Sequence, residues 1–249
     1  MIILKSRSEI EKMRKSNAIV AVILEELRKK IRPGVKTIEL DRLSEELALK
    51  KGARPAFKGY RGYPYSLCAS VNSEVVHGMP SDKELKEGDI VSLDFGILND
   101  GYYGDAAVTV PVGEITPAAK RLLRVTEEAL YRGIAEVKAG NRIGDISAAI
   151  QDHVEAAGYS VVRDLVGHGI GKSLHEDPQV PNYGSSGRGV ELKPGMVFAI
   201  EPMVNEGTYR VEILRDGWTV VTADGKLSAH FEHSVAITEN GPVILSRIG

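Results

Sequence analysis

The sequence predicts an α+β fold in which two similar halves pack together within one domain. Two motifs occur twice, in the same order and at nearly the same spacing. Residues 32–34 (RPG) and 138–140 (KAG) each precede a predicted helix, at an offset of 140 − 34 = 106. Residues 85–94 and 192–201 match at an offset of 201 − 94 = 107. This period is too long for a solenoid repeat, so we expect two α+β halves related by a pseudo-two-fold axis.

The composition is that of an ordinary globular protein, and the chain is long enough for a single large domain. Its 249 residues are 43% apolar and 27% charged, and we place the two halves at about 1–112 and 113–249. The net charge of −2 provides no field that would attract nucleic acid or an anionic membrane. Cys68 is the only cysteine, which excludes an internal disulfide and a zinc–thiolate site. Apolar runs near the start are too short for a signal peptide or a membrane span, so we expect a cytoplasmic protein.

Two helices are predicted in the first half. Ser8 and Glu11 have the spacing of a capping box, and apolar residues follow them at helical intervals. This helix should end near the basic residues 28–32, which lead into a Pro-Gly stop. We interpret the basic cluster as a solvated helix end, with a contact to RNA as the alternative. A second helix should begin at Thr37 and end at Gly52.

A predicted hairpin then brings two carboxylates together. After a glycine- and tyrosine-rich loop (57–65) and a predicted strand (67–76), a short apolar strand ends on Asp94. The turn signal NDG follows at 99–101, and the returning strand leads to Asp105. Two neighbouring carboxylates in an apolar setting repel each other unless one is protonated or a cation lies between them. The alternative interpretation is that both aspartates cap turns.

The second half is predicted to repeat the helix pair and to add a polar strand. Thr116 is a predicted N-cap with proline at the next position, and its helix should run to about residue 137. Another amphipathic helix is predicted from about 143 to 157. Residues 229–237 are predicted as a strand, and its alternation places His230 and Glu232 on one face. A carboxylate on such a strand, when buried, needs an ion-pair partner or a metal ion.

Four carboxylates and one histidine form the candidate metal-binding set. A lone histidine is more often structural, but the one in GHGIG (167–171) lies on backbone that a ligand can approach closely. Glu201 occupies the same place in the second repeat as Asp94 in the first, so symmetry should bring both to the junction of the halves. Hard oxygen ligands with one imidazole suit Mn²⁺, Fe²⁺ or Co²⁺ at least as well as Zn²⁺, and bridging carboxylates can hold two ions. The set is Asp94, Asp105, His168, Glu201 and Glu232.

Seven short segments, together with Asp94 and the pair His175-Glu176, carry a resemblance to a known family. The segments are 56–60 (AFKGY), 76–78 (VHG), 100–105 (DGYYGD), 167–171 (GHGIG), 200–205 (IEPMVN), 216–219 (DGWT) and 231–233 (FEH). Together they resemble the type I methionine aminopeptidases of the short bacterial form, over essentially the whole chain. The resemblance implies the pita-bread fold of that family, which agrees with the internal repeat.

The resemblance also implies a role for each candidate residue. The implied ligands of two divalent metal ions (Co, Mn, Fe or Zn) are Asp94, Asp105, His168, Glu201 and Glu232. The implied methionine pocket consists of Tyr60, Tyr63, Cys68 and Trp218. His77 and His175 would contact the substrate, and together with Glu201 they form the implied catalytic group. Phe57 and Leu174 differ from the residues that some relatives carry beside this pocket.

The activity implied by the resemblance is removal of the N-terminal methionine from nascent proteins and peptides when the second residue is small. Glu201 would relay a proton to the leaving amine, His175 would donate a hydrogen bond to the oxyanion, and His77 would hold the next amide. Two alternatives remain, an X-Pro peptidase on the same fold and a non-enzymatic binding protein of this fold. We expect a monomer with no membrane partner and no sequence-specific nucleic-acid partner. A contact of residues 28–32 with the ribosome is a further hypothesis.

Overall fold

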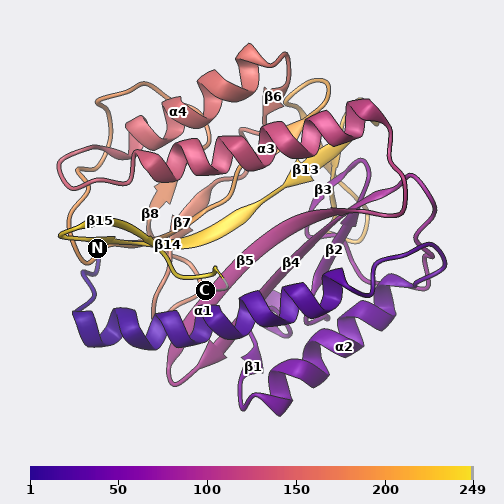
Figure 1. Cartoon of the computed structure of the whole chain (residues 1–249), viewed down its shortest axis with the longest axis horizontal. Helices are drawn as coiled ribbons and strands as arrows, with labels where there is room; N and C mark the ends of the chain where they lie inside the picture. Colours follow the sequence, from indigo (N-terminus) through magenta and orange to yellow (C-terminus); the bar gives the residue numbers. More distant parts are fainter. Residues whose placement is uncertain (248–249) are drawn as a thin grey trace.

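A large antiparallel sheet organises the fold in the computed structural model, which describes residues 1–247 (Figure 1). Its strands lie in the order β1 (Arg54–Pro55), β4 (Ile90–Asn99), β5 (Tyr102–Pro111), β14 (Glu232–Thr238), β9 (Val197–Ile200), β7 (Gly167–Gly169) and β8 (Glu176–Val180). Two further strands pair at its sides, β2 (Cys68–Val71) with β4 and β15 (Gly241–Ile244) with β14. One small sheet contains β13 (Ser228–His230), β10 (Met203–Asn205) and β6 (Ser160–Val161), and another contains β11 (Val211–Ile213), β12 (Val220–Thr222) and β3 (Glu74–Val76).

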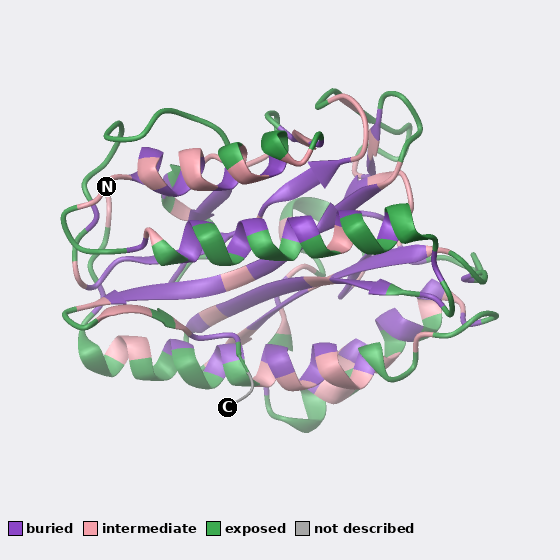
Figure 2. Cartoon of the chain, turned by 45° about the horizontal axis from the view of Figure 1, so that its top comes forward, coloured by how far each residue is buried: buried purple, intermediate pink, exposed green. Residues whose placement is uncertain are grey.

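Four helices are arranged as two pairs along the sheet. The first pair is α1 (Arg7–Arg28) and α2 (Thr37–Lys50), and the second is α3 (Pro117–Ala135) and α4 (Ile143–Ala156). Figure 1 shows the pairs at the bottom and top of the view, with β4, β5 and β14 between them. The helices turn buried residues toward the sheet and exposed residues outward (Figure 2), as amphipathic helices do. No helix within residues 1–247 is long and apolar enough to cross a bilayer.

The two halves meet where β5 pairs with β14, in a register that sets Ala107 opposite Glu232. Strand β4 flanks this pair on one side and β9 flanks it on the other. Equivalent contacts recur in each half: the Gly34 amide donates to the Leu85 carbonyl at 2.8 Å, and the Gly140 amide donates to the Leu192 carbonyl at 3.0 Å. The α+β fold with two related halves is therefore confirmed. The division near residue 112 stays a prediction.

Each helix pair packs its own hydrophobic cluster against the sheet. In the first half Leu93 and Phe95 of β4 are fully buried and cluster with residues of α1 and α2. Burying side chains of this size contributes about 1.5–3 kcal/mol each. The second half has a corresponding cluster under α3 and α4. Because strand residues alternate between faces, Asp94 must face away from the helices.

The N-terminal capping box involves different residues from those predicted. Ser6, not Ser8, is the N-cap: its hydroxyl accepts from the Glu9 amide at 3.3 Å, and the Glu9 carboxylate accepts from the Ser6 amide at 2.9 Å. Both pairs have the required spacing, so the sequence motif alone could not distinguish them. The Tyr102 hydroxyl decides the register, because it donates to Glu9 at 2.8 Å and fixes the carboxylate in place. The predicted helix at Thr37, the predicted Thr116 cap and the helix predicted from about residue 143 are confirmed.

Three strand predictions need correction. The stretch 67–76 is two strands, because Asn72 adopts a left-handed conformation (φ 59°) and turns the chain. The first hairpin strand does not end on Asp94 but continues to Asn99, so Asp94 and Asp105 lie within the sheet. Residues 229–237 are interrupted at Phe231, whose amide donates to the Pro202 carbonyl, and the two pieces belong to different sheets.

The close packing of β5 on α1 makes a prediction about stability. A Cβ added to Gly104 would lie 2.8 Å from the backbone of Ser16 and Asn17 in the helix. Because a helix backbone cannot yield locally, Gly104→Ala should lower the free energy of unfolding by about 3 kcal/mol. The matched control is Gly101→Ala, which meets nothing within 4 Å but has a positive φ of 78°. It should lose about 1 kcal/mol. Urea unfolding measures both, and equal losses would contradict the packing argument.

Candidate metal centre and substrate pocket

One cavity of about 190 Å³ gathers the site residues that the sequence predicts. It opens on the face of the sheet away from the helices, and its walls come from both halves of the fold. The predicted residues among its lining are Tyr60, Tyr63, Cys68, His77, Asp94, Asp105, His168, His175, Glu201, Trp218 and Glu232. Segments more than 170 residues apart in the sequence therefore contribute to one site.

The sheet positions each of the five candidate metal ligands. Asp94 lies in the middle of β4, and Asp105 of β5 lies opposite Gly96 of the same hairpin. Glu232 begins β14, which pairs directly with β5. His168 is the central residue of β7, and Glu201 directly follows β9. Strands contribute a regular backbone, so these side chains are held more rigidly than on loops.

Three of the five ligands already form a compact group. One ligand atom each from Asp105, His168 and Glu232 lies within 4.8 Å of the other two, and all three residues are buried. The His168 Nδ1 atom lies 2.9 Å from the Gly169 carbonyl oxygen. That contact fixes the proton on Nδ1 and leaves the Nε2 lone pair free to bind, as in many metal-ligating histidines. Nε2 lies 3.6 Å from Glu201 Oε1.

Burial shifts the pKa of every carboxyl group in the cavity upward. Burial raises the pKa of Asp94 to about 7, with the His230 ring opposing the shift and Glu201 adding to it. Burial likewise raises the pKa of Glu201 to about 8. The pKa values of Asp105 and Glu232 rise well above the ordinary range, first through burial and then through the neighbouring carboxylates. Without a cation, these groups cannot all be ionised at neutral pH.

Unpartnered oxygens test whether the site fits a metal ion. Asp94 Oδ1, Asp105 Oδ1 and Glu232 Oε1 are buried, and none has a hydrogen-bond partner within residues 1–247. Buried polar atoms are nearly always paired, so such a cluster needs an explanation. Divalent cations coordinated by carboxylate and imidazole supply one, and the donor set suits them. The residues present therefore fit a metal centre.

Two further histidines border the cavity. His175 lies on the exposed rim, where its Nδ1 atom is 2.9 Å from the Tyr60 hydroxyl and its ring centroid is 4.2 Å from that of His168. His77 adopts a left-handed backbone conformation (φ 57°), which costs about 1–2 kcal/mol for a residue with a side chain. Such strain is concentrated at functional sites. Burial lowers the pKa of both histidines, that of His77 to about 4, so both rings are neutral.

An apolar slot adjoins the carboxylates. Tyr63 is buried, its hydroxyl donates to the carbonyls of Leu67 (3.1 Å) and Gly78 (3.2 Å), and its ring contacts that of Trp218 edge-on at 5.1 Å. Cys68 of β2 lies opposite Asp94 of β4, so its thiol borders the carboxylates. Aromatic rings and a thiol offer soft, polarisable contacts. Phe57 and Leu174 also line the cavity.

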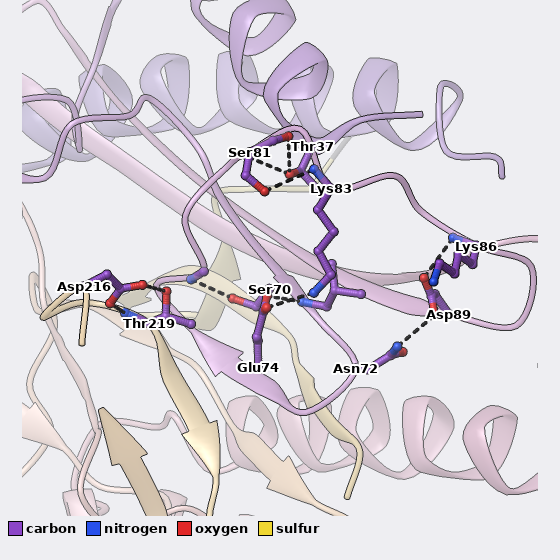
Figure 3. Close-up of polar contacts among 12 residues, drawn as sticks. Thr37, Ser70, Asn72, Glu74, Ser81, Lys83, Lys86, Asp89, Asp216 and Thr219 are labelled. Atoms are coloured by element: carbon purple, nitrogen blue, oxygen red, sulfur yellow. Dashed lines mark hydrogen bonds and ion pairs between the residues drawn. The ribbon is translucent and has the colours of Figure 1, made fainter. Parts of the chain in front are cut away.

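Polar contacts hold together the segments that flank this slot, among them those of Glu74 and Asp216 (Figure 3). Glu74 accepts from Lys83 at 2.9 Å and so ties the β2–β3 hairpin to the following loop. Asp216 accepts from the Thr219 hydroxyl at 2.6 Å and closes the turn that presents Trp218. Strand β12, which follows that turn, pairs with β3. The slot is therefore supported from behind by hydrogen bonds.

Sequence reasoning missed several residues around the cavity. Its lining also includes Arg61, Val76, Leu165, Val166 and Met203. The predicted strand alternation puts His230 on the same face as Glu232, yet His230 is not among the predicted site residues. It is 1% exposed, and its Nε2 lies 3.6 Å from Glu201 Oε2. The alternation around Glu232 is the sequence signal that could have identified His230. The apolar lining residues have no comparable signal in the sequence.

The pseudo-symmetric sheet and its carboxylate-rich cavity define a metal-dependent hydrolase of the pita-bread fold. Comparison with known proteins makes the class specific. The model of metallopeptidase family M24 matches residues 11–239, and the chain belongs to that family.

Its relatives narrow the assignment further. A methionine aminopeptidase of Clostridium perfringens is 58% identical over 248 residues, covering 100% of both chains. The crystal structure of a methionine aminopeptidase from Thermotoga maritima superposes with a TM-score of 0.98 at 55% identity, covering 100% of both chains. A prolidase from Pyrococcus furiosus shares the fold with a TM-score of 0.80 at 26% identity, but the match covers only 66% of the prolidase. The family relationship implies divalent metal ions as cofactors.

The raised carboxyl pKa values predict how pH and metal act on stability. Because Asp94 (about 7) and Glu201 (about 8) titrate above their ordinary range, the folded protein binds more protons than the unfolded chain. The free energy of unfolding of the chelator-treated protein should therefore decrease as the pH rises from about 6.5 to about 8. Buried histidines have lowered pKa values and act in the opposite sense only below about pH 6.5.

Added Mn²⁺ should remove this fall, because it binds the ionised carboxylates. The increase in melting temperature on adding Mn²⁺ should thus be larger at the higher pH, measured by calorimetry. Samples brought to the same ionic strength with NaCl serve as the control for nonspecific ionic effects. If Mn²⁺ raised the melting temperature equally at about pH 6.5 and about pH 8, the assignment of these carboxylates as the binding site would be wrong.

Proposed function

We propose that this chain is a metal-dependent methionine aminopeptidase that acts on nascent proteins and peptides whose second residue is small. The observation that carries the proposal is the juxtaposition of the carboxylate cluster with an apolar slot lined by aromatic rings and a thiol. The cluster fits a metallopeptidase centre, and the slot fits a thioether side chain. Full-length relatives named methionine aminopeptidase support the same function.

The proposed metal centre uses all five carboxylate and imidazole ligands. Two divalent ions, of Co, Mn, Fe or Zn, would be held by Asp94, Asp105, His168, Glu201 and Glu232. When bound, such ions lower the pKa of a water molecule and polarise a carbonyl oxygen. Support for the ligand set comes from the unpartnered carboxylate oxygens and from the free Nε2 of His168.

Glu201 is proposed as the residue that carries the proton to the leaving amine. Its two oxygens lie 3.6 Å from His168 Nε2 and His230 Nε2, respectively, so the carboxylate is flanked by neutral rings. Burial keeps its proton affinity high, with a pKa of about 8 in the protein alone, which suits a group that must both take up and release a proton.

The other two histidines of the cavity, His77 and His175, are proposed to position the peptide. His175 would donate a hydrogen bond to the carbonyl oxygen as negative charge develops on it. The contact of its Nδ1 with the Tyr60 hydroxyl leaves Nε2 available for that donation. His77 would hold the amide beyond the scissile bond, and its strained backbone fits a residue selected for position.

Tyr60, Tyr63, Cys68 and Trp218 are proposed to bind the methionine side chain. The remaining partners are proposals as well. Nascent N-termini would be the substrates in the cytoplasm, and the enzyme would act as a monomer. The exposed basic residues 28–32 at the end of α1 are the proposed contact with the ribosome.

Peptide hydrolysis tests the function directly. Chelator-treated protein should release no methionine from Met-Ala-Ser, and adding Mn²⁺, Fe²⁺ or Co²⁺ should restore release, because the carboxylate cluster needs a cation to be active. Leu-Ala-Ser is the matched control and should stay intact, because a branched side chain does not match the narrow slot. Free amino acids are measured by mass spectrometry. Preference for an X-Pro bond whatever the first residue would favour a prolidase-like activity instead.

Replacement of the proton carrier provides a second test. Glu201→Gln should reduce kcat on Met-Ala-Ser by about 10²–10⁴, because general acid–base catalysis contributes a factor of that size. Glu39→Gln, at an exposed position of α2, is the matched control and should keep full activity. Metal content is measured alongside by atomic emission. Near-normal turnover of Glu201→Gln with metal bound would exclude the proposed role.

A further inference from the structure

The loop that carries His175 is held from behind by an ion pair away from the cavity. Lys5 Nζ lies 2.5 Å from Glu176 Oε2, and the two side chains are only 4% and 8% exposed. The ion pairs that other lysines and arginines form within residues 1–247 are far more exposed, such as Lys50–Glu46 at 67% and 57%. Exposed pairs contribute little, whereas removing one partner of a buried pair leaves an uncompensated charge. Lys5 therefore differs from the surface lysines.

Glu176 links this lysine to the turn before His175. Its second oxygen, Oε1, accepts from the Ser173 amide at 3.1 Å, so both oxygens of the carboxylate are used. Glu176 also begins β8 and lies opposite Gly169 in the ladder with β7. One carboxylate thus joins the Lys5 ammonium, the turn at Ser173 and the strand that follows His175.

The Lys5 side chain is closely packed against Gly171 and is anchored by further hydrogen bonds. A Cβ on Gly171 would lie 2.6 Å from both Lys5 Cε and Glu176 Oε1. The Lys5 amide donates to the Gly195 carbonyl at 2.7 Å, and its ammonium also donates to the Ile3 carbonyl at 2.9 Å. The lysine is anchored by both its main chain and its side chain, so it is a fixed support for the loop.

We propose that Lys5 is a positioning residue that, through Glu176, fixes the His175 ring at the mouth of the cavity. On its cavity side His175 is held by the Tyr60 hydroxyl and by ring contacts with Tyr60 and His168. With the ion pair intact, the loop has no freedom to carry the ring away from the peptide carbonyl. The proposal rests on the proposed function, because His175 matters for rate only if the chain is the aminopeptidase.

Kinetics and hydrogen exchange of Lys5→Met test the proposal on the metal-loaded enzyme. Methionine keeps the length and apolar stem of lysine but loses the charge. With Met-Ala-Ser, kcat should fall by about 10- to 100-fold, the effect expected when a catalytic group is misplaced. KM should stay within about threefold, because the methionine slot lies elsewhere. Amide exchange measured by mass spectrometry should become faster in residues 170–177.

Two control variants separate positioning from a general loss of stability. Val154→Ala removes buried volume from α4 and should lower the melting temperature without changing kcat or exchange in residues 170–177. Lys50→Met removes the charge of an exposed pair and should change neither stability nor activity. If Lys5→Met does not fold, Glu176→Gln carries the same test, because it keeps an acceptor for the Ser173 amide while removing the charge.

Each outcome is decisive. Reduced kcat together with faster exchange in residues 170–177 supports the proposal. The double variant Lys5→Met/Glu176→Gln should then have a kcat no lower than that of either single variant, because both substitutions break the same ion pair. Unchanged kcat in Lys5→Met, or a fall that Val154→Ala reproduces, overturns the role of Lys5. Failure of the wild-type enzyme to release methionine with any metal overturns the proposed function itself.

Discussion

The structure depends on placing four carboxyl groups in one cavity without a protein cation to neutralise them. Arg61, on the exposed rim, is the cationic side chain among the cavity lining of the described chain. Desolvation of an isolated charge costs several kcal/mol, and the groups respond by raising their pKa values. Only a firmly held backbone can keep such groups together. Asp94, Asp105 and Glu232 lie on paired strands, so separating them would break the sheet itself. A bound divalent cation reverses the balance, because the charges that repel each other then become its ligands.

Pseudo-two-fold symmetry explains how one chain assembles this cluster. The repeat places Asp94 on β4 in one half and Glu201 directly after β9 in the other, while β5 and β14 pair between these two strands. Each half encloses its own hydrophobic cluster beneath its own helices, so the opposite face of the sheet is free for polar chemistry. The candidate ligands are divided between the halves, with Asp94 and Asp105 in the first and His168, Glu201 and Glu232 in the second. All five come together only when the halves are joined, so the proposed metal binding would be coupled to the folding of the whole chain.

The chemistry of the site was easier to predict from the sequence than its local geometry. Carboxylates at equivalent repeat positions, such as Asp94 and Glu201, are visible in the sequence because residue type and spacing carry the signal. The capping register was wrong by two residues because Tyr102, 93 positions from Glu9, selects Ser6. Left-handed conformations at Asn72 and His77 were unexpected because neither residue is glycine. The contact of Lys5 with Glu176 spans 171 residues, and no local pattern reports it. Contacts between residues far apart in the sequence thus determine local details, such as the capping register, that short motifs do not specify.

The same burial acts in opposite directions on the two kinds of titrating group, and this makes the cavity suitable for metal chemistry. It raises the pKa of the carboxyl groups and lowers that of the imidazoles, to about 3 for His168. Without a cation both kinds tend toward their neutral forms. A divalent ion restores charge only to the carboxylates, because a neutral imidazole is already the form that coordinates. His168 can thus ligate without first losing a proton, and His175 can stay a neutral hydrogen-bond donor. The Lys5–Glu176 ion pair lies outside the cavity, where Lys5 Nζ is 2.5 Å from Glu176 Oε2. The ion pair proposed to hold the His175 loop is thus separate from the carboxylates proposed to bind metal.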